Sequence, residues 1–314
     1  MKIVATGSAV PDLIVGNQEL TGFLDTSDQW IRERTGIEQR RIHQGDLEML
    51  AARAAQNALA AAGLSAGQLD LILCSNVHSR YLTPSLSSVV QGLIGASCPC
   101  LDINGACAGF VYALEIAAAH LQSRRYQRIL LLCAEEPTRM VDWHDRSTCV
   151  LFGDAAAAAI AVPEGEAPLF KMGVVSNDQA IYAYHGPGNC PYEKSDRRET
   201  PLVMKGQEVY KFAVQSSQAD IQYLCGQAGI GLEQVDYFLL HQANARIVEA
   251  VRSHLRQPPE KFPSNVRRYG NTSSAGLPLL LDEVNRQGKL QPGDTVILSA
   301  FGAGLTTGSC LLKW

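Results

Sequence analysis

The sequence lacks long hydrophobic runs and an excess of positive charge. Its longest apolar run beyond the N-terminal region, Ala155 to Val162, is too short to cross a bilayer, and Pro11 and Asp12 interrupt any apolar segment near the start. The formal net charge of -4 at pH 7 gives no general attraction for a phosphate backbone. We therefore expect a cytoplasmic protein that binds neither a membrane nor nucleic acid.

Metal-binding patterns are also missing. The 9 cysteines are an odd number, lie far apart, and several fall inside apolar runs, which is typical of buried thiols in a reducing compartment. Cys98 and Cys100 form a Cys-Pro-Cys, but no second cysteine pair or pair of histidines at ligand spacing accompanies them. We therefore predict no metal site.

What is present is enough apolar material for a large folded core. The chain has 314 residues, of which 46% are hydrophobic and 18% charged, and its 27 glycines are spread along the whole length. This length exceeds one ordinary core, so the sequence indicates two domains or two duplicated halves.

Strand-like and helical segments alternate, which is typical of an α/β fold. The expected strands of the first half are Ile3 to Ala5, Leu69 to Ser75, Pro99 to Ile103 and Arg128 to Ala134. The expected helices are Asp46 to Ala62, ended by Gly63, a helix with Pro84 as its first residue and Gly95 at its end, and an amphipathic segment from Cys107 to Leu121.

An internal repeat indicates duplication. Ala62-Gly63-Leu64 recurs as Ala228-Gly229-Ile230 at an offset of 166 residues, and Cys107-Ala108-Gly109 is matched by Ser274-Ala275-Gly276 at an offset of 167. One period of this size predicts two copies of a domain-sized unit rather than a solenoid. We place the halves at residues 1–165 and 166–314, joined by the polar turn around Pro163.

Cys107 has the most reactive position among the cysteines. It follows an expected strand and the turn Asn104-Gly105-Ala106, and it opens a helix. Free backbone N–H groups and the helix dipole at such a place favour the thiolate and lower the pKa of the thiol. Cys107 is therefore a candidate nucleophile, although a packed structural cysteine fits its residue type equally well.

His241 and Asn271 are weaker signals alone. His241 directly follows the expected strand Val235 to Leu240, where a histidine is more often a cap or a satisfied core group. Asn271 precedes the helix equivalent to the one that Cys107 opens, where asparagine is ordinarily a turn or N-cap residue. Together with Cys107 they lie at strand carboxyl ends of a duplicated fold, where a shared crevice is expected.

The glycines near the C-terminus resemble a dinucleotide fingerprint only superficially. Gly302, Gly304 and Gly308 follow the expected strand Thr295 to Ala300, but only six residues remain after Gly308, too few for the helix and second strand of that unit. A tight turn that exposes backbone N–H groups to an oxyanion is the better interpretation.

Four motifs taken together are similar to those of one enzyme family. They are Asn104-Gly105-Ala106-Cys107-Ala108-Gly109-Phe110, His241-Gln242-Ala243-Asn244, Tyr269-Gly270-Asn271-Thr272-Ser273-Ser274-Ala275 and Phe301-Gly302-Ala303-Gly304. In this order they resemble β-ketoacyl-acyl-carrier-protein synthase III of the thiolase superfamily, over the whole chain. The resemblance implies two βαβαβαββ halves in five layers, a homodimer, and a condensing acyltransferase of fatty acid or polyketide biosynthesis.

The resemblance also implies the role of each catalytic residue. Cys107 takes an acyl group from an acyl-CoA, while the backbone N–H groups of Cys107 and Ala303 hold the tetrahedral oxyanion. His241 and Asn271 stabilise the enolate formed when a malonyl-acyl-carrier protein loses CO2, and the enolate attacks acyl-Cys107. Both thioesters are substrates, so no cofactor is expected.

Two further groups of residues carry over from the family. The residues expected to contact CoA are Trp30, Arg34, Arg146 and Arg246. The residues expected to form a basic patch for the acidic acyl carrier protein are Lys211, Arg246, Arg252 and Arg256. An indole stacks on adenine and guanidinium groups pair with phosphates, although a single surface arginine is ordinarily just a solvated charge.

Two departures from the family pattern concern the substrate. Ala303 stands where three consecutive glycines are usual, which adds a methyl group beside the oxyanion site. Leu82-Thr83 precede Pro84 where the family has a pocket-lining phenylalanine, in a segment one residue longer. The missing ring leads us to expect starters longer or bulkier than acetyl.

Two other functions stay open. A relative of the same fold passes its acyl group to a carrier or a hydroxyl without condensation, and decarboxylation of malonyl thioester distinguishes the two. A noncatalytic partner subunit that keeps only the fold is less favoured, because Cys107, His241 and Asn271 are all present.

Overall fold

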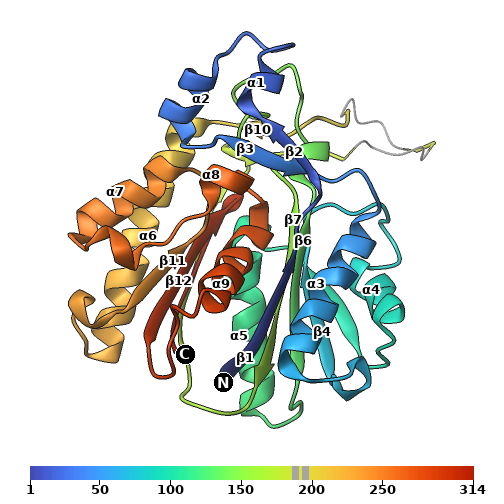
Figure 1. Ribbon diagram of the computed structural model, residues 1–314, viewed down its shortest axis with the longest axis vertical. Helices are drawn as coiled ribbons and strands as arrows, with labels where there is room; N and C mark the ends of the chain where they lie inside the picture. Colours follow the sequence, from blue (N-terminus) through green and yellow to red (C-terminus); the bar gives the residue numbers. More distant parts are fainter. Residues whose placement is uncertain (186–190, 193–197) are drawn as a thin grey trace.

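The structure is a computed structural model that describes residues 1–185, 191–192 and 198–314 (Figure 1). One of the nine cysteines, Cys190, lies outside the described residues, and the other eight are free thiols. No helix of the described chain is long and apolar enough to span a membrane.

The first half forms a five-stranded sheet. Its strands are β1 (Lys2–Ala9), β4 (Leu71–Ser75), β5 (Cys100–Ile103), β6 (Ile129–Glu135) and β7 (Ala155–Val162). Their order in space is β1-β7-β6-β4-β5, with β4, β5 and β6 parallel and both β1 and β6 antiparallel to β7. Because the parallel strands end at one edge, the loops that follow them meet there.

The second half repeats this plan. Its strands are β8 (Leu169–Asn177), β11 (Tyr237–Leu240), β12 (Thr295–Gly302) and β13 (Gly304–Lys313). Over the described residues they form a four-stranded sheet in the order β11-β12-β13-β8, in which β11 and β12 are parallel and the remaining pairs antiparallel. The sheets match strand for strand except at β5, so the predicted duplication and the thiolase-type α/β fold are confirmed.

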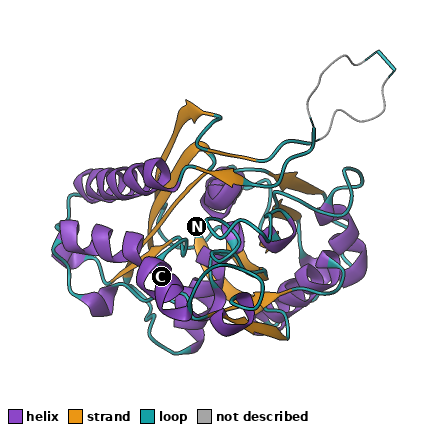
Figure 2. Cartoon of the chain, turned by 90° about the horizontal axis from the view of Figure 1, so that it is seen from above, coloured by secondary structure: helices purple, strands orange, loops and turns teal. Residues whose placement is uncertain are grey.

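Helices separate and cover the two sheets (Figures 1 and 2). Helices α5 (Gly109–Gln122) and α9 (Gly276–Arg286) lie between the sheets and form the central apolar core. Helices α3 (Leu47–Ala62) and α4 (Leu86–Ile94) pack on the outer face of the first sheet, and α6 (Gly206–Ala228) and α7 (Ala245–Leu255) on that of the second. The chain therefore forms the five layers that we predicted.

The helix boundaries show which local signals were correctly interpreted. Helix α3 has Asp46 at its N-cap and Gly63 in the left-handed region at its C-cap, with φ 64°, as its sequence predicts. Helix α4 ends at Gly95 as expected, but the prediction that Pro84 is its first residue was wrong. The helix begins at Leu86 because the Ser85 hydroxyl accepts the backbone N–H of Ser88 at 3.3 Å and caps it.

Shorter elements cover one end of the two sheets, at the top of Figure 1. They are α1 (Asn17–Leu20), α2 (Asp28–Thr35), α8 (Val266–Tyr269), the ribbon of β2 (Leu13–Gly16) and β3 (Gln39–Ile42), and the ribbon of β9 (Ile181–Tyr182) and β10 (Val203–Met204). A separate apolar cluster that includes Leu20, Ile31 and Ile37 anchors α1 and α2. No helix or strand lies between the end of β7 at Val162 and the start of β8 at Leu169, and our division of the chain at residue 165 stays a prediction.

Candidate active site

A cavity of about 520 Å³ brings together side chains from both halves and from α2. The predicted residues on its wall are Cys107, His241, Asn271, Ala303, Trp30, Arg34, Arg146 and Arg246. They come from seven separate places in the chain, so their convergence depends on the fold and not on local sequence. Lys211, Arg252 and Arg256 do not line the cavity.

Cys107 lies in a single 3-10 turn, Ala106–Ala108, that leads directly into α5. The preceding residue, Ala106, has φ 47°, in the left-handed region that side-chain-bearing residues rarely adopt. Ser273, which occupies the equivalent position of the second half, has φ 52° and begins the matching turn before α9. The two strained turns meet, because the Cys107 Sγ atom lies 3.6 Å from the Ser273 Oγ atom.

The prediction that the helix start lowers the pKa of Cys107 was wrong. The pKa of this thiol is raised to about 12. Burial is the largest cause and the charge of Glu135 adds to the rise, while the hydrogen bond with Ser273 opposes it. The loss of hydration raises the pKa of Cys107 more than the N–H groups of one short turn lower it. Cys107 is therefore a thiol at neutral pH, and its proton must be removed when it attacks.

The turn between β12 and β13 lies against the backbone of Cys107. A Cβ atom placed on Gly302 would come within 2.7 Å of the Cys107 nitrogen, so only glycine allows this approach. Ala303 follows at the cavity wall without a positive φ, so its methyl group imposes no backbone strain. The backbone N–H groups of Cys107 and Ala303 therefore belong to two segments in close approach.

His241 follows the end of β11 and is 2% exposed. Its backbone N–H donates to the Ser299 carbonyl at 2.8 Å, and its ring contacts Phe301 edge-on, with centroids 5.2 Å apart. Burial lowers the pKa of His241 to about 4, so the imidazole is neutral near pH 7. Its Nδ1 atom has no hydrogen-bond partner among the described residues.

Asn271 is fixed by three hydrogen bonds. Its backbone N–H donates to the Leu151 carbonyl at 2.8 Å, and its carbonyl accepts the N–H of Gly153 at 3.1 Å. Its side-chain oxygen accepts the backbone N–H of Ser273 at 2.9 Å. Because the oxygen of the carboxamide is used within the turn, the Nδ2 group is the donor left for a ligand in the cavity.

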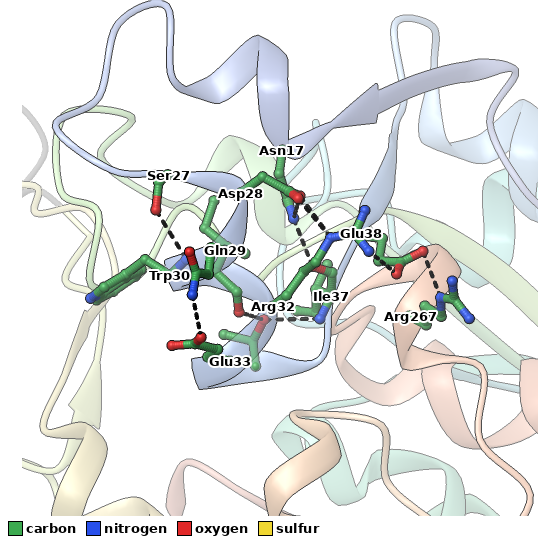
Figure 3. Close-up of polar contacts among 12 residues, drawn as sticks. Asn17, Ser27, Asp28, Gln29, Trp30, Arg32, Glu33, Ile37, Glu38 and Arg267 are labelled. Carbon is green, nitrogen blue, oxygen red and sulfur yellow. Dashed lines mark hydrogen bonds and ion pairs between the residues drawn. The ribbon is translucent and has the colours of Figure 1, made fainter.

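Helix α2 presents Trp30 and Arg34 to the cavity, and polar contacts on its other side hold it in place (Figure 3). The Ser27 hydroxyl caps the helix by accepting the Trp30 N–H at 3.0 Å. Asp28 accepts from Asn17 at 2.8 Å and from Arg32 at 2.9 Å. Since residues 30 and 34 are one turn apart, both face the same side.

Three arginines lie at the mouth of the cavity around aromatic rings. The guanidinium groups of Arg34 and Arg146 lie 5.7 Å and 5.3 Å from the centre of the Trp30 ring. Arg246, at the start of α7, lies 5.8 Å from the centre of the Tyr210 ring. Exposed positive charge next to an indole suits a ligand with an aromatic base and phosphates.

The predicted carrier-docking residues lie outside the cavity. Lys211 is exposed on α6, and Arg256 is exposed at the C-cap of α7. Arg252 is half-buried and pairs with Glu249 at 2.5 Å, while it also donates to the Gln257 carbonyl. Its charge is therefore partly neutralised within its own helix, which the sequence analysis did not consider.

Leu82 and Thr83 do not line the cavity of their own chain. Leu82 is 90% exposed, and Leu86, which follows closely, is buried in the core between α3, α4 and the first sheet. The prediction that a missing ring at this position widens the acyl pocket therefore does not hold within one chain.

Sequence reasoning missed one charged residue of the cavity. Glu135 ends β6 and is 1% exposed, and its carboxylate accepts the Ser274 hydroxyl at 2.5 Å. Burial raises the pKa of Glu135 to about 7. The sequence did contain a signal for Glu135, because a charged residue ends an otherwise apolar strand. His241 was identified from a similar position, directly after a strand.

A cysteine at the start of a central helix, with an imidazole and a carboxamide across one cavity of a duplicated fold, defines the thiolase class of acyl-transferring enzymes. Comparison with known proteins narrows this class. Residues 101–176 match the family "3-Oxoacyl-[acyl-carrier-protein (ACP)] synthase III", and residues 225–314 match its C-terminal region.

Relatives of known sequence and structure match this chain over its full length. The chain is 40% identical to β-ketoacyl-[acyl-carrier-protein] synthase III of Clostridium novyi, covering 100% of this chain and 99% of that one. The crystal structure of the Aquifex aeolicus synthase III superposes with a TM-score of 0.92 at 36% identity, covering 100% and 99% of the two chains. The priming β-ketosynthase of the R1128 polyketide pathway gives 0.93 at 30%, covering 99% and 96%.

The chain therefore belongs to the β-ketoacyl-acyl-carrier-protein synthase III family, and the resemblance seen in its motifs is confirmed. It is an acyltransferase of the condensing type, in a family that initiates fatty acid or polyketide chains.

Proposed function

We propose that this enzyme condenses an acyl-CoA starter with malonyl-acyl-carrier protein through an acyl group on Cys107. The observation that carries the proposal is the convergence of Cys107, His241 and Asn271 on one cavity whose mouth holds Trp30 and exposed arginines. The cavity offers a nucleophile, two neutral groups and a site for an adenine nucleotide. The reaction takes place in the cytoplasm and uses no cofactor.

The first step transfers the acyl group to Cys107. The thiol attacks the thioester carbonyl, and negative charge develops on the carbonyl oxygen as the carbon becomes tetrahedral. The backbone N–H groups of Cys107 and Ala303 hold this oxygen, supported by the close approach of Gly302 to Cys107. CoA leaves with the sulfur that carried the acyl group.

The second step forms an enolate from the malonyl thioester. As CO2 leaves, charge develops on the thioester oxygen, and the free Nδ2 group of Asn271 and the N–H of neutral His241 donate to it. The two donors need no protonation near pH 7, because the pKa of His241 is about 4 and a carboxamide does not titrate. The enolate then attacks acyl-Cys107 and expels its thiolate.

The mouth of the cavity binds the CoA portion in this proposal. Trp30 stacks on the adenine, and Arg34, Arg146 and Arg246 pair with the phosphates. Acyl carrier protein approaches the same mouth over α6 and α7. The basic patch there consists of the exposed Lys211, Arg246 and Arg256 and the half-buried Arg252.

A homodimer completes the proposed enzyme. Strand β5 is one of the two outer strands of the five-stranded sheet, and Leu101 on it is 43% exposed. Leu93 of α4 is equally exposed, and Leu82 is 90% exposed. Exposed apolar side chains beside an open strand edge suit pairing with a second copy. Leu82 of each subunit would then be available to the cavity of the other.

Intact-mass measurement with a series of acyl-CoA thioesters tests the proposal. We expect an acyl adduct on wild-type enzyme that disappears when malonyl-acyl-carrier protein is added, with release of CO2 and β-ketoacyl product. An adduct that passes to a carrier or hydroxyl without CO2 would support the non-condensing alternative. Absence of any adduct would contradict both functions.

A further inference from the structure

The thiol proton of Cys107 needs an acceptor when the acyl group is transferred. Burial keeps Cys107 protonated, and His241, the other titratable group predicted for the reaction, has a pKa lowered to about 4 and so binds a proton weakly. No hydrogen bond joins Cys107 to His241 among the described contacts, whereas the Cys107 Sγ atom contacts the Ser273 hydroxyl at 3.6 Å. The acceptor is best sought beyond Ser273.

Ser273 and Ser274 connect the nucleophile to a buried carboxyl group. The Ser274 hydroxyl donates to one oxygen of Glu135 at 2.5 Å, and the backbone N–H of Val77 donates to the other at 3.2 Å. The Ser273 hydroxyl also acts on Glu135, where its hydrogen bonding opposes the rise in pKa. Cys107, Ser273 and Glu135 all line the cavity. The Ser273 hydroxyl lies beside Cys107, and the next residue, Ser274, binds Glu135.

The backbone at Ser273 explains how its hydroxyl reaches this place. Its φ of 52° lies in the left-handed region, and its N–H is held by the Asn271 side chain at 2.9 Å. A strained residue that is fixed by its neighbours and contacts a reactive group is a common feature of active sites. Glu135 itself lies on the cavity wall at the end of β6.

We propose that Glu135 accepts the proton of Cys107 through the hydroxyl of Ser273 during acyl transfer. This inference rests on the proposed function, in which Cys107 attacks a thioester. As the bond between Sγ and the acyl carbon forms, the Cys107 proton passes to Ser273 and the Ser273 proton passes to Glu135. The bond between the acyl carbon and the CoA sulfur then breaks, and the proton held by Glu135 neutralises the departing CoA thiolate.

Among the titratable groups that line the cavity, Glu135 is the one whose pKa is shifted to near neutral pH. Cys74 on β4 and Cys133 on β6 are fully buried thiols whose pKa values burial raises, as it does for Cys107. His241 stays neutral above about pH 4. The pKa of Glu135 is about 7, so the ionised fraction of its carboxyl group increases as the pH rises through 7. The reactivity of Cys107 should therefore rise through pH 7.

Alkylation of Cys107 by iodoacetamide tests this proposal without any acyl-CoA. The rate is followed by intact mass on the full chain from pH 5.5 to 9, with peptide mapping to Cys107. We expect the wild-type rate to increase through an inflection near pH 7. In Glu135→Gln the inflection disappears and the rate at pH 8 falls by roughly a hundredfold, the usual contribution of a positioned base.

A matched control is the neighbouring carboxyl of Glu136. It is also buried, with a pKa also raised to about 7, but it pairs with Arg139 at 3.3 Å and does not line the cavity. Glu136→Gln should keep the wild-type profile. An equal loss in both variants would contradict the proposal, because it would indicate a general effect of removing a buried carboxyl.

Whether Glu135→Gln is alkylated more slowly or faster than wild type distinguishes proton transfer from an effect of the Glu135 charge alone. The negative charge of Glu135 raises the pKa of Cys107, so a carboxylate that acted only through its charge would make Glu135→Gln alkylate faster than wild type. Faster or unchanged alkylation overturns the proposal. Ser273→Ala should reproduce the loss seen in Glu135→Gln. Ser274→Ala should keep the rate at high pH and move the inflection upward, because the Ser274 hydroxyl lowers the pKa of Glu135.

The two proposals fail in different ways. If alkylation follows this pattern but no acyl-CoA modifies Cys107, the proton route stands and the proposed function is wrong. If acyl-CoA modifies Cys107 normally in both Glu135→Gln and Ser273→Ala, the proton route is wrong and the proposed function stands.

Discussion

Replacement of Asn271 by alanine should separate the two halves of the reaction. The carboxamide has two roles in the structure: its oxygen accepts the Ser273 N–H at 2.9 Å, and its Nδ2 group is left for the thioester oxygen of the malonyl unit. Loss of one such donor costs about 3 kcal/mol of transition-state stabilisation, or roughly a hundredfold or more in rate. We expect decarboxylation to fall by that factor, while self-acylation changes by only a few fold.

The effect of losing the Asn271 oxygen, which binds Ser273, must be separated from the effect of losing its Nδ2 donor. Asn271→Ala also leaves the buried N–H of Ser273 without its acceptor, which costs about 1 to 3 kcal/mol of folding free energy. Asn271→Asp keeps an oxygen acceptor for Ser273 but replaces the donor by a negative charge. We therefore expect Asn271→Asp to keep the melting temperature close to wild type and to decarboxylate as poorly as Asn271→Ala.

The assay measures both steps on the same preparation. Intact mass after addition of acyl-CoA gives the rate of acylation of Cys107, and release of labelled CO2 from malonyl-acyl-carrier protein gives the rate of decarboxylation. His241→Ala should show the same division, because neutral His241 supplies the other donor. Normal decarboxylation in both Asn271 variants would refute the assignment of Nδ2 as a donor, and lost acylation in both would refute the separation of the steps.

Three further predictions concern the nucleophile, the oxyanion turn and the starter. Cys107→Ser should form no acyl adduct by intact mass, because a hydroxyl is far less acidic than a thiol; full condensation by this variant would exclude Cys107 as the nucleophile. Gly302→Ala should lower kcat/KM for acyl-CoA by at least about tenfold, since the added Cβ would lie 2.7 Å from the Cys107 nitrogen. The control variant Ala303→Gly should keep kcat/KM near the wild-type value. In the proposed homodimer, Leu82 of one copy takes the place of an aromatic ring beside the cavity of the other. Acyl-CoA starters longer than acetyl should therefore be accepted, each buried methylene contributing about 0.8 kcal/mol. A kcat/KM that falls steeply beyond acetyl would show that Leu82 of a second copy, or another side chain, closes the pocket.

The parts of the fold with strong local signals could be predicted from the sequence. The apolar run Leu69 to Ser75 predicted strand β4 to within two residues, and Gly63 predicted the end of helix α3. Both predictions succeeded because hydrophobic periodicity and helix capping depend on local sequence. The repeat at an offset of 166 to 167 residues predicted two copies of one domain-sized unit, and the described residues form a five-stranded and a four-stranded sheet with matching strand order. The helix after Pro84 began later than expected, since the Ser85 cap is a stronger start signal than the proline.

Features that depend on distant contacts could not be predicted. The pKa of Cys107 rises because segments from both halves bury it, and no local rule shows that burial outweighs the helix start. Glu135 was not identified because its partner Ser274 is 139 residues away. Leu82 was assigned to the pocket by alignment with the family pattern, but its side chain faces solvent in the single chain.

The equivalent turns at Ala106 and Ser273 explain why this duplicated chain has one reaction centre instead of two. Both copies begin a central helix with a residue in the same unusual backbone conformation, and the two turns lie in contact. A second nucleophile at 274 would therefore compete for the same space as the first instead of creating an independent site. The two copies of the unit therefore share one cavity, in which the first copy contributes Cys107 and the second contributes Ser273.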